Sequence, residues 1–331
     1  MVSPGLSGPH ARLGAEINAA PNMTTLLVTH SACLDHETPP GHPECADRLR
    51  AVLGALEAEE FALLARDEAP RATREQIARV HPEAHIDRIE KGAPAEGFRR
   101  IDADTAMSPG SAEAAFRAAG ATVHAVDEVM AGRVRNAFCA VRPPGHHAEP
   151  ETPMGFCLFN NIAIAAQHAR AVHGCARVAV VDFDVHHGNG TQAAFETDPS
   201  LFYASTHQWP LYPGTGRAGE HGLGNIYNRT LQPGAGSDEF RAAVSGAILP
   251  SLANFRPDFI FISAGFDAHM ADPLANLRLT DEDFGWVTGE LVKLAGELCG
   301  GRVVSALEGG YDLEALAASS RAHVRALMLT A

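Results

Sequence analysis

The sequence lacks the features that mark secreted, membrane and nucleic-acid-binding proteins. None of its six cysteines belongs to a CxxC pair or a closely spaced set, so we expect free thiols in a reducing compartment rather than a disulfide framework. No apolar run approaches the roughly 18 residues that cross a membrane. The net charge of −14 argues against a broad surface for nucleic acid or anionic lipid. We therefore expect a cytoplasmic protein with neither nucleic acid nor membrane as a partner.

The N-terminal stretch also lacks the apolar segment of a signal peptide. Residues 1–22 contain Gly, Pro and Ser, and we expect them to form a flexible arm. The remaining residues, 23–331, predict one domain, because 46% of the chain is apolar and this is enough to bury a large core. The oligomeric state is left open, and a homo-oligomer is possible.

Short apolar runs alternate with helical patterns along the chain. Most of the runs are apolar throughout, as expected of strands covered on both faces. The alternation predicts an α/β fold with a central, mostly parallel sheet flanked by helices. We expect strands at 25–29, 137–141, 178–182, 201–204, 258–263 and 302–306, and helices near 45–59, 111–131, 160–173, 238–254, 281–299 and 313–328.

Polar and titratable residues follow five of the expected strands. The segments at these strand ends read RPPGHH, DFDVHH, STHQW, AGFDAH and LEGGYD. In an open α/β sheet, ligands bind beyond the carboxyl ends of the strands. The sequence therefore predicts one cleft that is built from loops far apart in the chain.

Acidic residues and histidines in two of these segments have the pattern of a metal site. Asp182, Asp184 and His186 alternate along the chain, so their side chains can share a face. One Asp and one His of this set supply two ligands, and a catalytic zinc needs a third protein ligand and an open position for water. Asp267, after another buried strand, is the best candidate for the third. The alternative is that these aspartates only cap helices or close turns.

Two further segments offer groups for acid–base chemistry. His146 and His147 follow Pro-Pro-Gly in a strand-end loop, and a histidine suits proton transfer beside a metal-bound water. Tyr311 follows two glycines, and its phenol can donate to a developing oxyanion. The alternatives are two surface histidines and a tyrosine that only packs. The position of all three at the proposed cleft favours the catalytic interpretation.

Six segments together resemble the histone deacetylase-like amidohydrolases. RPPGHHA, GFCLFNN, VDFDVHHGNGTQ, YPGTG, SAGFDAHMADPL and EGGYDL occur here in the order found in that family, over residues 25–328. The family includes class II histone deacetylases, bacterial deacetylases of the acetoin-utilisation type and acetylpolyamine amidohydrolases. The resemblance implies the arginase–deacetylase α/β fold, with a single catalytic domain. It also implies zinc-dependent removal of an acyl group from an amine such as Nε-acetyl-lysine.

The resemblance also implies roles for individual residues. Asp184, His186 and Asp267 would bind the zinc ion, and Tyr311 would donate to the oxyanion. His146 and His147 would be the tandem catalytic histidines, with His147 the general base and acid and Asp182 accepting a hydrogen bond from His146. Gly155, Phe156 and Tyr212 would wall a narrow tunnel for an acyl-lysine-like arm, with Asp104 at its rim. A structural potassium ion would lie among main-chain oxygens of Asp182, Asp184, His186 and Thr206 and side-chain oxygens of Asp182 and Ser205.

Three positions depart from the pattern of some relatives. Asn189 stands where some members have an Asp that pairs with the second histidine, although the class II pattern HGNGT has Asn as well. Without that carboxylate His147 should be less basic, which favours a neutral base at rest. Tyr212 replaces a Phe that many relatives carry. Leu274 stands where some polyamine-selective relatives have an acidic residue, which disfavours a cationic polyamine substrate.

Three other functions are weighed against a protein or peptide deacetylase. A deacetylase for acetylated polyamines or small metabolites is the nearest alternative, because the same site would serve. An arginase-like ureohydrolase would need two manganese ions and the pattern SxDxDxxDP, but this chain has SAGFDAH. A non-catalytic acyl-binding module would be expected to lose a ligand or Tyr311, and all are present.

Overall fold

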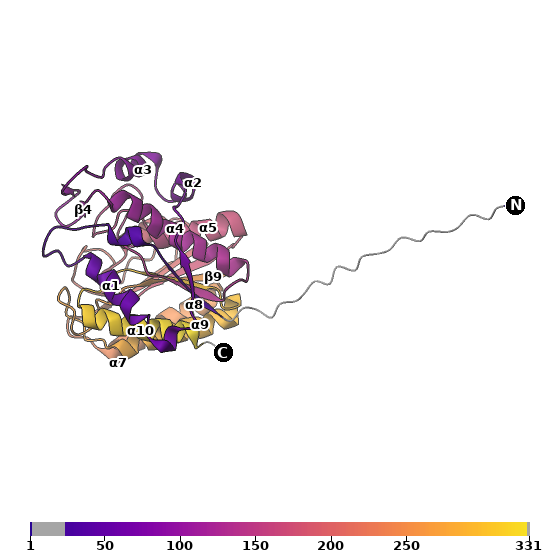
Figure 1. Ribbon diagram of the computed structural model, residues 1–331. Coiled ribbons are helices and arrows are strands. Elements are labelled where there is room, and N and C mark those ends of the chain that lie inside the picture. The colour runs from indigo at the N-terminus through magenta and orange to yellow at the C-terminus, as the bar shows by residue number, and fades with distance from the viewer. Residues whose placement is uncertain (2–23, 330–331) are drawn as a thin grey trace.

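A single parallel sheet forms the centre of the protein in the computed structural model (Figure 1), which describes residue 1 and residues 24–329. Eight strands follow the order β2-β1-β5-β10-β9-β6-β7-β8, and each neighbouring pair is parallel. The predicted α/β fold with a central sheet is confirmed. The strands are β1 (Thr25–Thr29), β2 (Ala65–Glu68), β5 (Asn136–Cys139), β6 (Val178–Asp182), β7 (Leu201–Gln208), β8 (Ile226–Leu231), β9 (Phe259–Ala264) and β10 (Val303–Leu307).

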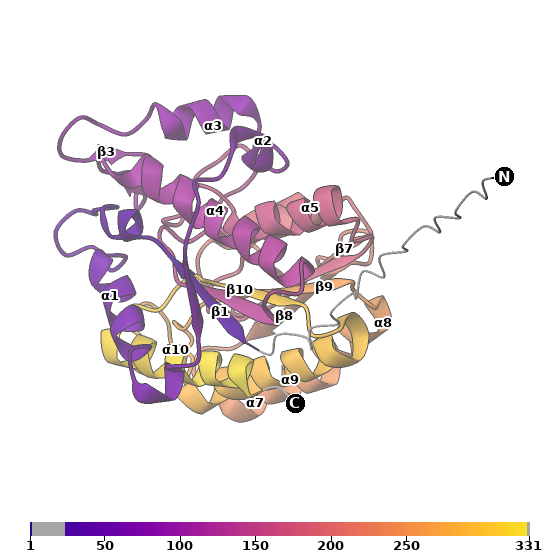
Figure 2. The ribbon, with the colours of Figure 1, turned by 45° about the vertical axis from the view of Figure 1, so that its right-hand side comes forward.

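Helices cover both faces of the sheet (Figure 2). α4 and α5 lie on one face with α2 and α3 beyond them, and α1, α9 and α10 lie on the other. A two-stranded ribbon of β3 (Arg99–Arg100) and β4 (Ala106–Met107) stands apart from the main sheet. The helices are α1 (Ala46–Ala55), α2 (Arg74–Ile77), α3 (Glu83–Glu90), α4 (Ser111–Met130), α5 (Asn161–His173), α6 (Asn189–Phe195), α7 (Ser237–Ala243), α8 (Leu249–Phe255), α9 (Asp281–Cys299) and α10 (Leu313–Met328).

The apolar runs of the sequence form the core between these layers. Every residue of β6 and of β9 is buried, because helices shield both faces of the sheet. On α4, Ala114, Ala118, Ala121 and Ala125 are fully buried at spacings of three and four residues, which places them on one helical face. Their small side chains let α4 lie close to its neighbours. Among the described residues, no helix is both long and apolar enough to cross a bilayer.

The predicted helices and strands are present, but one predicted helix is broken and several observed elements were not predicted. The expected helix at 238–254 divides into α7, a π-helical turn over Val244–Ile248 and α8. Pro250 explains the break, since it lacks the N–H that would continue the regular hydrogen-bond pattern. The sequence analysis missed β2, β3, β4, β8, α2, α3 and α6. These are short or partly exposed, so their apolar pattern is weak. The predicted arm at 1–22 falls, apart from Met1, outside the described residues.

A buried ion network joins the start of α1 to the loop after β5. Glu44, Arg48 and Arg142 are each 0% exposed. Glu44 accepts hydrogen bonds from Nη2 of Arg142 at 2.7 Å and from Nη1 of Arg48 at 3.1 Å. Arg142 also donates to the carbonyl oxygens of Cys33 at 2.9 Å and His36 at 3.0 Å. The network therefore fixes the loop that carries RPPGHH against the N-terminal part of the chain.

Removal of Glu44 should destabilise the protein strongly. In Glu44→Ala two buried guanidinium groups lose their anionic partner, and we expect the free energy of unfolding to fall by about 3–5 kcal/mol. Chemical denaturation followed by circular dichroism measures this change. The control is Glu57→Ala, whose ion pair with Arg66 is exposed and worth about 0–1 kcal/mol. Equal losses for the two variants would contradict the structural importance of the buried network.

Candidate active site

Four neighbouring strands in the middle of the sheet deliver the predicted catalytic and metal-binding residues. β5, β10, β9 and β6 are adjacent and parallel, so their carboxyl ends meet at one edge. The polar groups that follow these strands therefore lie at the centre of that edge. The segments after these strands carry, in the same order, His146 and His147, then Tyr311, then Asp267, then Asp184 and His186.

Asp184, His186 and Asp267 converge closely enough to share one ion. A ligand atom of each lies within 4.8 Å of the others, and all three residues are buried. His186 Nδ1 is 3.1 Å from a carboxylate oxygen of Asp184 and 3.1 Å from one of Asp267. One imidazole nitrogen and two carboxylate oxygens form a donor set that zinc accepts. The residues present fit a divalent metal ion.

The two carboxylates of this cluster stabilise positive charge placed between them. Burial by itself lowers the pKa of His186, but hydrogen bonds and charge from Asp184 and Asp267 outweigh it and raise that pKa to about 10. Burial raises the pKa of Asp184, but the charges of His146 and His186 hold it below its usual range. A metal ion would replace the proton of His186, because a ligating imidazole must be deprotonated.

Two glycines make room for the carboxylates. A Cβ at Gly265 would lie 2.0 Å from Oδ2 of Asp184, and a Cβ at Gly309 would lie 2.1 Å from Oδ2 of Asp267. Both distances are far below any allowed contact. A larger residue at either position would therefore displace a predicted ligand.

The tandem histidines have opposite electrostatic character. His146 Nδ1 lies 2.9 Å from Asp182 Oδ2, as predicted. Although burial lowers its pKa, the charges of Asp184 and Asp182 raise it well above the ordinary value. Burial, followed by the charges of His146 and His186, holds the pKa of His147 well below the ordinary value. His147 Nδ1 lies 2.8 Å from Oδ1 of Asn189. The pair thus combines a charged imidazole with a neutral one.

Tyr311 lies beside the cluster with its phenol protonated. Burial raises its pKa well above the ordinary value; Arg48 opposes the shift, and the charges of Asp267 and Asp184 add to it. The Arg48 guanidinium carbon lies 4.8 Å from the ring centroid. The ring of Phe156 meets that of Tyr311 edge-on, with centroids 5.9 Å apart. A neutral phenol in this position can donate a hydrogen bond to a developing oxyanion.

The predicted tunnel residues gather around the histidines. The ring of Tyr212 meets that of His147 edge-on at 5.1 Å. A Cβ at Gly155 would lie 2.5 Å from the His147 ring, so this glycine gives the imidazole its space. Phe156 and Tyr212 are partly exposed.

Asp104, predicted at the rim, and Leu274 are each linked to a predicted tunnel or catalytic residue through a neighbour. Asp104 is half-buried, and its carbonyl oxygen lies 2.9 Å from Nε2 of His42, whose ring meets Phe156 edge-on. Leu274 is also half-buried, and its N–H donates to Asp272. The other oxygen of Asp272 accepts the N–H of Tyr311 at 2.7 Å. Asp104 and Leu274 are therefore each joined through one intervening residue, His42 or Asp272, to Phe156 or Tyr311.

Three of the five predicted potassium ligands lie on two neighbouring strands, and Asp184 and His186 follow in the segment after β6. Asp182 on β6 pairs with Ser205 on β7, and Thr206 follows directly. His207 Nε2 lies 2.8 Å from the carbonyl oxygen of Gly216, so this nitrogen must donate. Its Nδ1 then accepts from the Ser205 hydroxyl, 2.8 Å away. The hydrogen of the Ser205 hydroxyl therefore points toward His207.

Comparisons with known proteins identify the family of the chain. A family model described as "Histone deacetylase domain" matches residues 42–327. The chain belongs to the histone deacetylase family. It is 42% identical to "Histone deacetylase 14, chloroplastic" of Arabidopsis thaliana over 92% of this chain and 76% of that protein. It is 39% identical to the "Histone deacetylase-like amidohydrolase" of Pseudomonas aeruginosa over 89% of this chain and 78% of that protein.

A solved structure supports the same assignment. The crystal structure of the HDA15 HD domain superposes with a TM-score of 0.87 at 37% identity, covering 92% of this chain and 88% of that one. The deacetylase fold expected from the sequence is thereby confirmed. The histone deacetylase family comprises deacetylases and amidohydrolases, so this chain carries the scaffold of a hydrolase.

Glu308 lies in the candidate site, and the sequence patterns did not predict it. Its Oε2 accepts the N–H groups of Gly145 at 2.6 Å and His146 at 3.1 Å, and Ser263 donates to Oε1 at 3.1 Å. Burial raises its pKa to about 7, against the opposing charge of His146. Glu308 therefore holds the histidine loop from the next strand. Its position in LEGGYD, directly after an expected strand, was the available signal.

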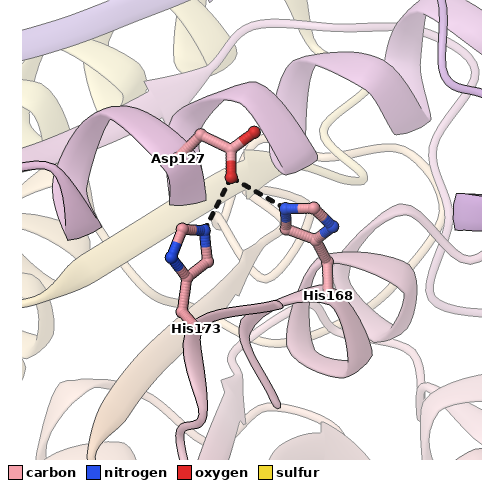
Figure 3. A group of neighbouring side chains, drawn as sticks. All are labelled: Asp127, His168 and His173. Atoms are coloured by element: carbon pink, nitrogen blue, oxygen red, sulfur yellow. Dashed lines mark hydrogen bonds and ion pairs between the residues drawn. The ribbon is translucent and has the colours of Figure 1, made fainter. Parts of the chain in front are cut away.

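A second group of histidines and aspartate lies far from this site. Asp127 of α4 faces His168 and His173 of α5 (Figure 3), with one carboxylate oxygen 2.8 and 2.7 Å from their Nε2 atoms. α5 ends just before β6 begins, so the group lies toward the opposite edge of the sheet. Arg79 donates to His168 Nδ1 at 2.9 Å, which leaves the proton of a neutral ring on Nε2. In this arrangement the group links two helices by hydrogen bonds.

Metal binding at Asp184, His186 and Asp267 should release protons. Because the pKa of His186 is about 10 without a metal, zinc titrated into the metal-free protein at pH 7 must displace at least one proton. Affinity should then fall by about tenfold for each unit of falling pH. Isothermal titration calorimetry in two buffers of different ionisation enthalpy measures the release. Asp267→Ala should abolish tight binding, and tight binding without proton release would contradict the assigned ligands.

Proposed function

We propose that the chain is a zinc-dependent amidohydrolase that removes an acetyl or other acyl group from an amine such as Nε-acetyl-lysine. The observation that supports this most is the convergence of Asp184, His186 and Asp267 beside two histidines of opposite charge state. A zinc ion held there would polarise the acyl carbonyl and lower the pKa of water. The family's deacetylases and amidohydrolases act on the corresponding bond.

The protein's own residues supply the proton transfers. His147, neutral at rest, accepts the proton of the attacking water. Tyr311 donates a hydrogen bond to the oxyanion that forms at the acyl carbon. His147 then returns the proton to the departing amine, and the charged His146, paired with Asp182, stabilises negative charge nearby. The opposite pKa shifts of the two histidines suit this division of roles.

The cleft walls set the shape of the substrate. Phe156 and Tyr212 would flank an extended aliphatic arm, with Gly155 leaving space for His147 behind it. Asp104 at the rim would accept a backbone N–H of a peptide substrate. Leu274 offers no charge to a polyamine, which favours acyl-lysine in a peptide or protein over an acetylated polyamine. The family leaves the acyl chain length open.

A potassium ion would stabilise the ligand-bearing turn. It would bind main-chain oxygens of Asp182, Asp184, His186 and Thr206 together with the side chains of Asp182 and Ser205. The pairing of Asp182 with Ser205 on the neighbouring strand, and the position of Thr206 next to Ser205, support this site. We also keep the prediction that the protein is cytoplasmic. The names of the plant relatives do not change this prediction, because the location that they give applies to those proteins.

A panel of acylated amines tests the function directly. The purified, metal-quantified protein should contain one zinc ion per chain and hydrolyse a fluorogenic acetyl-lysine peptide, and a hydroxamate should block the reaction. Acetylated polyamines, longer acyl-lysines and small acetylated metabolites in the same panel rank the substrates. A requirement for two manganese ions would favour a ureohydrolase, and binding without turnover would favour an acyl-binding module; either result contradicts the proposal.

Tyr311→Phe should lower kcat by about 10²–10³-fold, because one oxyanion donor is lost. Zinc content, measured by elemental analysis, should stay at the wild-type level. Tyr227→Phe is the matched control, since Tyr227 stacks on Phe202 in the sheet and should keep wild-type turnover. Wild-type turnover by Tyr311→Phe would exclude the assigned role.

A further inference from the structure

The amide of Asn189 is held at both of its ends. Its Oδ1 faces His147 Nδ1 at 2.8 Å. Its Nδ2 donates to Glu149 Oε1 at 2.8 Å and approaches the sulfur of Met154 at 3.3 Å. A carboxylate and a thioether only accept hydrogen bonds. The nitrogen end of the amide must therefore face Glu149, and the oxygen end must face the histidine.

This orientation decides the tautomer of His147. The amide oxygen of Asn189 can only accept, so the hydrogen of a neutral His147 ring must lie on Nδ1. Nε2 is then the nitrogen with the free lone pair, which a general base requires. If the amide were reversed, its N–H would favour the opposite tautomer and Nε2 would carry the hydrogen. Proton abstraction by Nε2 would then be blocked.

We propose that Glu149 is a positioning residue, which acts through Asn189 to hold His147 in the tautomer of a general base. The proposed function is needed only for the effect of Glu149 on turnover. The tautomer itself is a property of the resting protein. Glu149 also places a negative charge behind the amide. This charge polarises the hydrogen bond that the imidazolium formed during the reaction donates to the Asn189 oxygen.

The surrounding backbone holds Glu149 in place. The N–H of Glu149 donates to the carbonyl oxygen of Thr152 at 3.0 Å, and the N–H of Thr152 returns a bond at 3.3 Å. A Cβ at Gly190 would lie 2.2 Å from the carbonyl oxygen of Ala148, so the first turn of α6 packs directly on the segment before Glu149. Asn189 and Glu149 therefore come from two closely fitted segments.

Variants of Glu149 separate orientation from charge. In Glu149→Leu the acceptor is lost, and we expect kcat to fall by about 10–100-fold, a part of the 10²–10⁴-fold that acid–base catalysis supplies. KM and zinc content should stay within about twofold of wild type. In Glu149→Gln the side-chain carbonyl can still accept from Asn189, so the loss should stay within about fivefold. Glu151→Leu and Glu151→Gln are the matched controls, because Glu151 is an exposed residue of the same loop.

Nitrogen-15 NMR of labelled histidine gives a readout that does not depend on turnover. His147, assigned by comparison with His147→Gln, should carry its hydrogen on Nδ1 in wild type and in Glu149→Gln, and on a mixture of nitrogens in Glu149→Leu. An unchanged tautomer in Glu149→Leu overturns the inference, whatever happens to kcat. If the wild type hydrolyses no acylated amine, the proposed function fails, and this spectrum still decides the role of Glu149.

A paired substitution provides a second test. Asn189→Asp alone places two carboxylates against each other, and we expect kcat to fall by at least about tenfold. When Glu149→Gln is added, the new carboxylate can accept from both the glutamine amide and His147, so kcat should rise by about threefold or more above that of Asn189→Asp, although the carboxylate beside His147 keeps it below the wild-type value. Purely additive losses in the double variant would overturn the relay through Asn189.

Discussion

The active site depends on the burial of several carboxylates at the centre of one sheet edge. Asp182, Asp184, Asp267 and Glu308 are each at most 1% exposed. A buried, unpaired carboxylate costs several kcal/mol or takes up a proton. Here hydrogen bonds from backbone N–H groups and the charges of neighbouring imidazoles offset part of that cost. The remaining negative charge is what makes the cluster a site for a cation rather than a defect in the core.

The same electrostatic field shifts the pKa values of the tandem histidines in opposite directions. His146 and His147 are adjacent in sequence and both are buried, so burial lowers the pKa of each. Only His146 has a carboxylate partner, Asp182, in direct contact. His147 instead meets the neutral amide of Asn189 and feels the positive charge of His146. One field therefore yields a charged and a neutral imidazole from two identical side chains, and this asymmetry is what proton transfer requires.

The sequence predicted the sheet and the centre of the site because both follow from simple patterns. Apolar runs locate buried strands, and parallel strands bring their carboxyl ends together, which was sufficient to group Asp184, His186 and Asp267. The edge strand β2 was not predicted, because its sequence, ARDE, has no apolar pattern and is mostly exposed. Glu308 and Glu149 were also missed. A lone glutamate has no spacing signal, and its role appears only when the fold brings its partners to it.

An asparagine rather than an aspartate at position 189 avoids the cost of burying a further charge. A carboxylate in direct contact with His147 would add a further acid beside the four buried carboxylates named above. It would also raise the pKa of His147 and favour the protonated form, which cannot accept a proton from water. With an amide at this position the acceptor for Nδ1–H is kept without the charge. The negative charge lies instead on Glu149, which is only half-buried and closer to solvent. An amide, unlike a carboxylate, has two chemically different ends, so its use creates a need for a second residue that fixes its orientation.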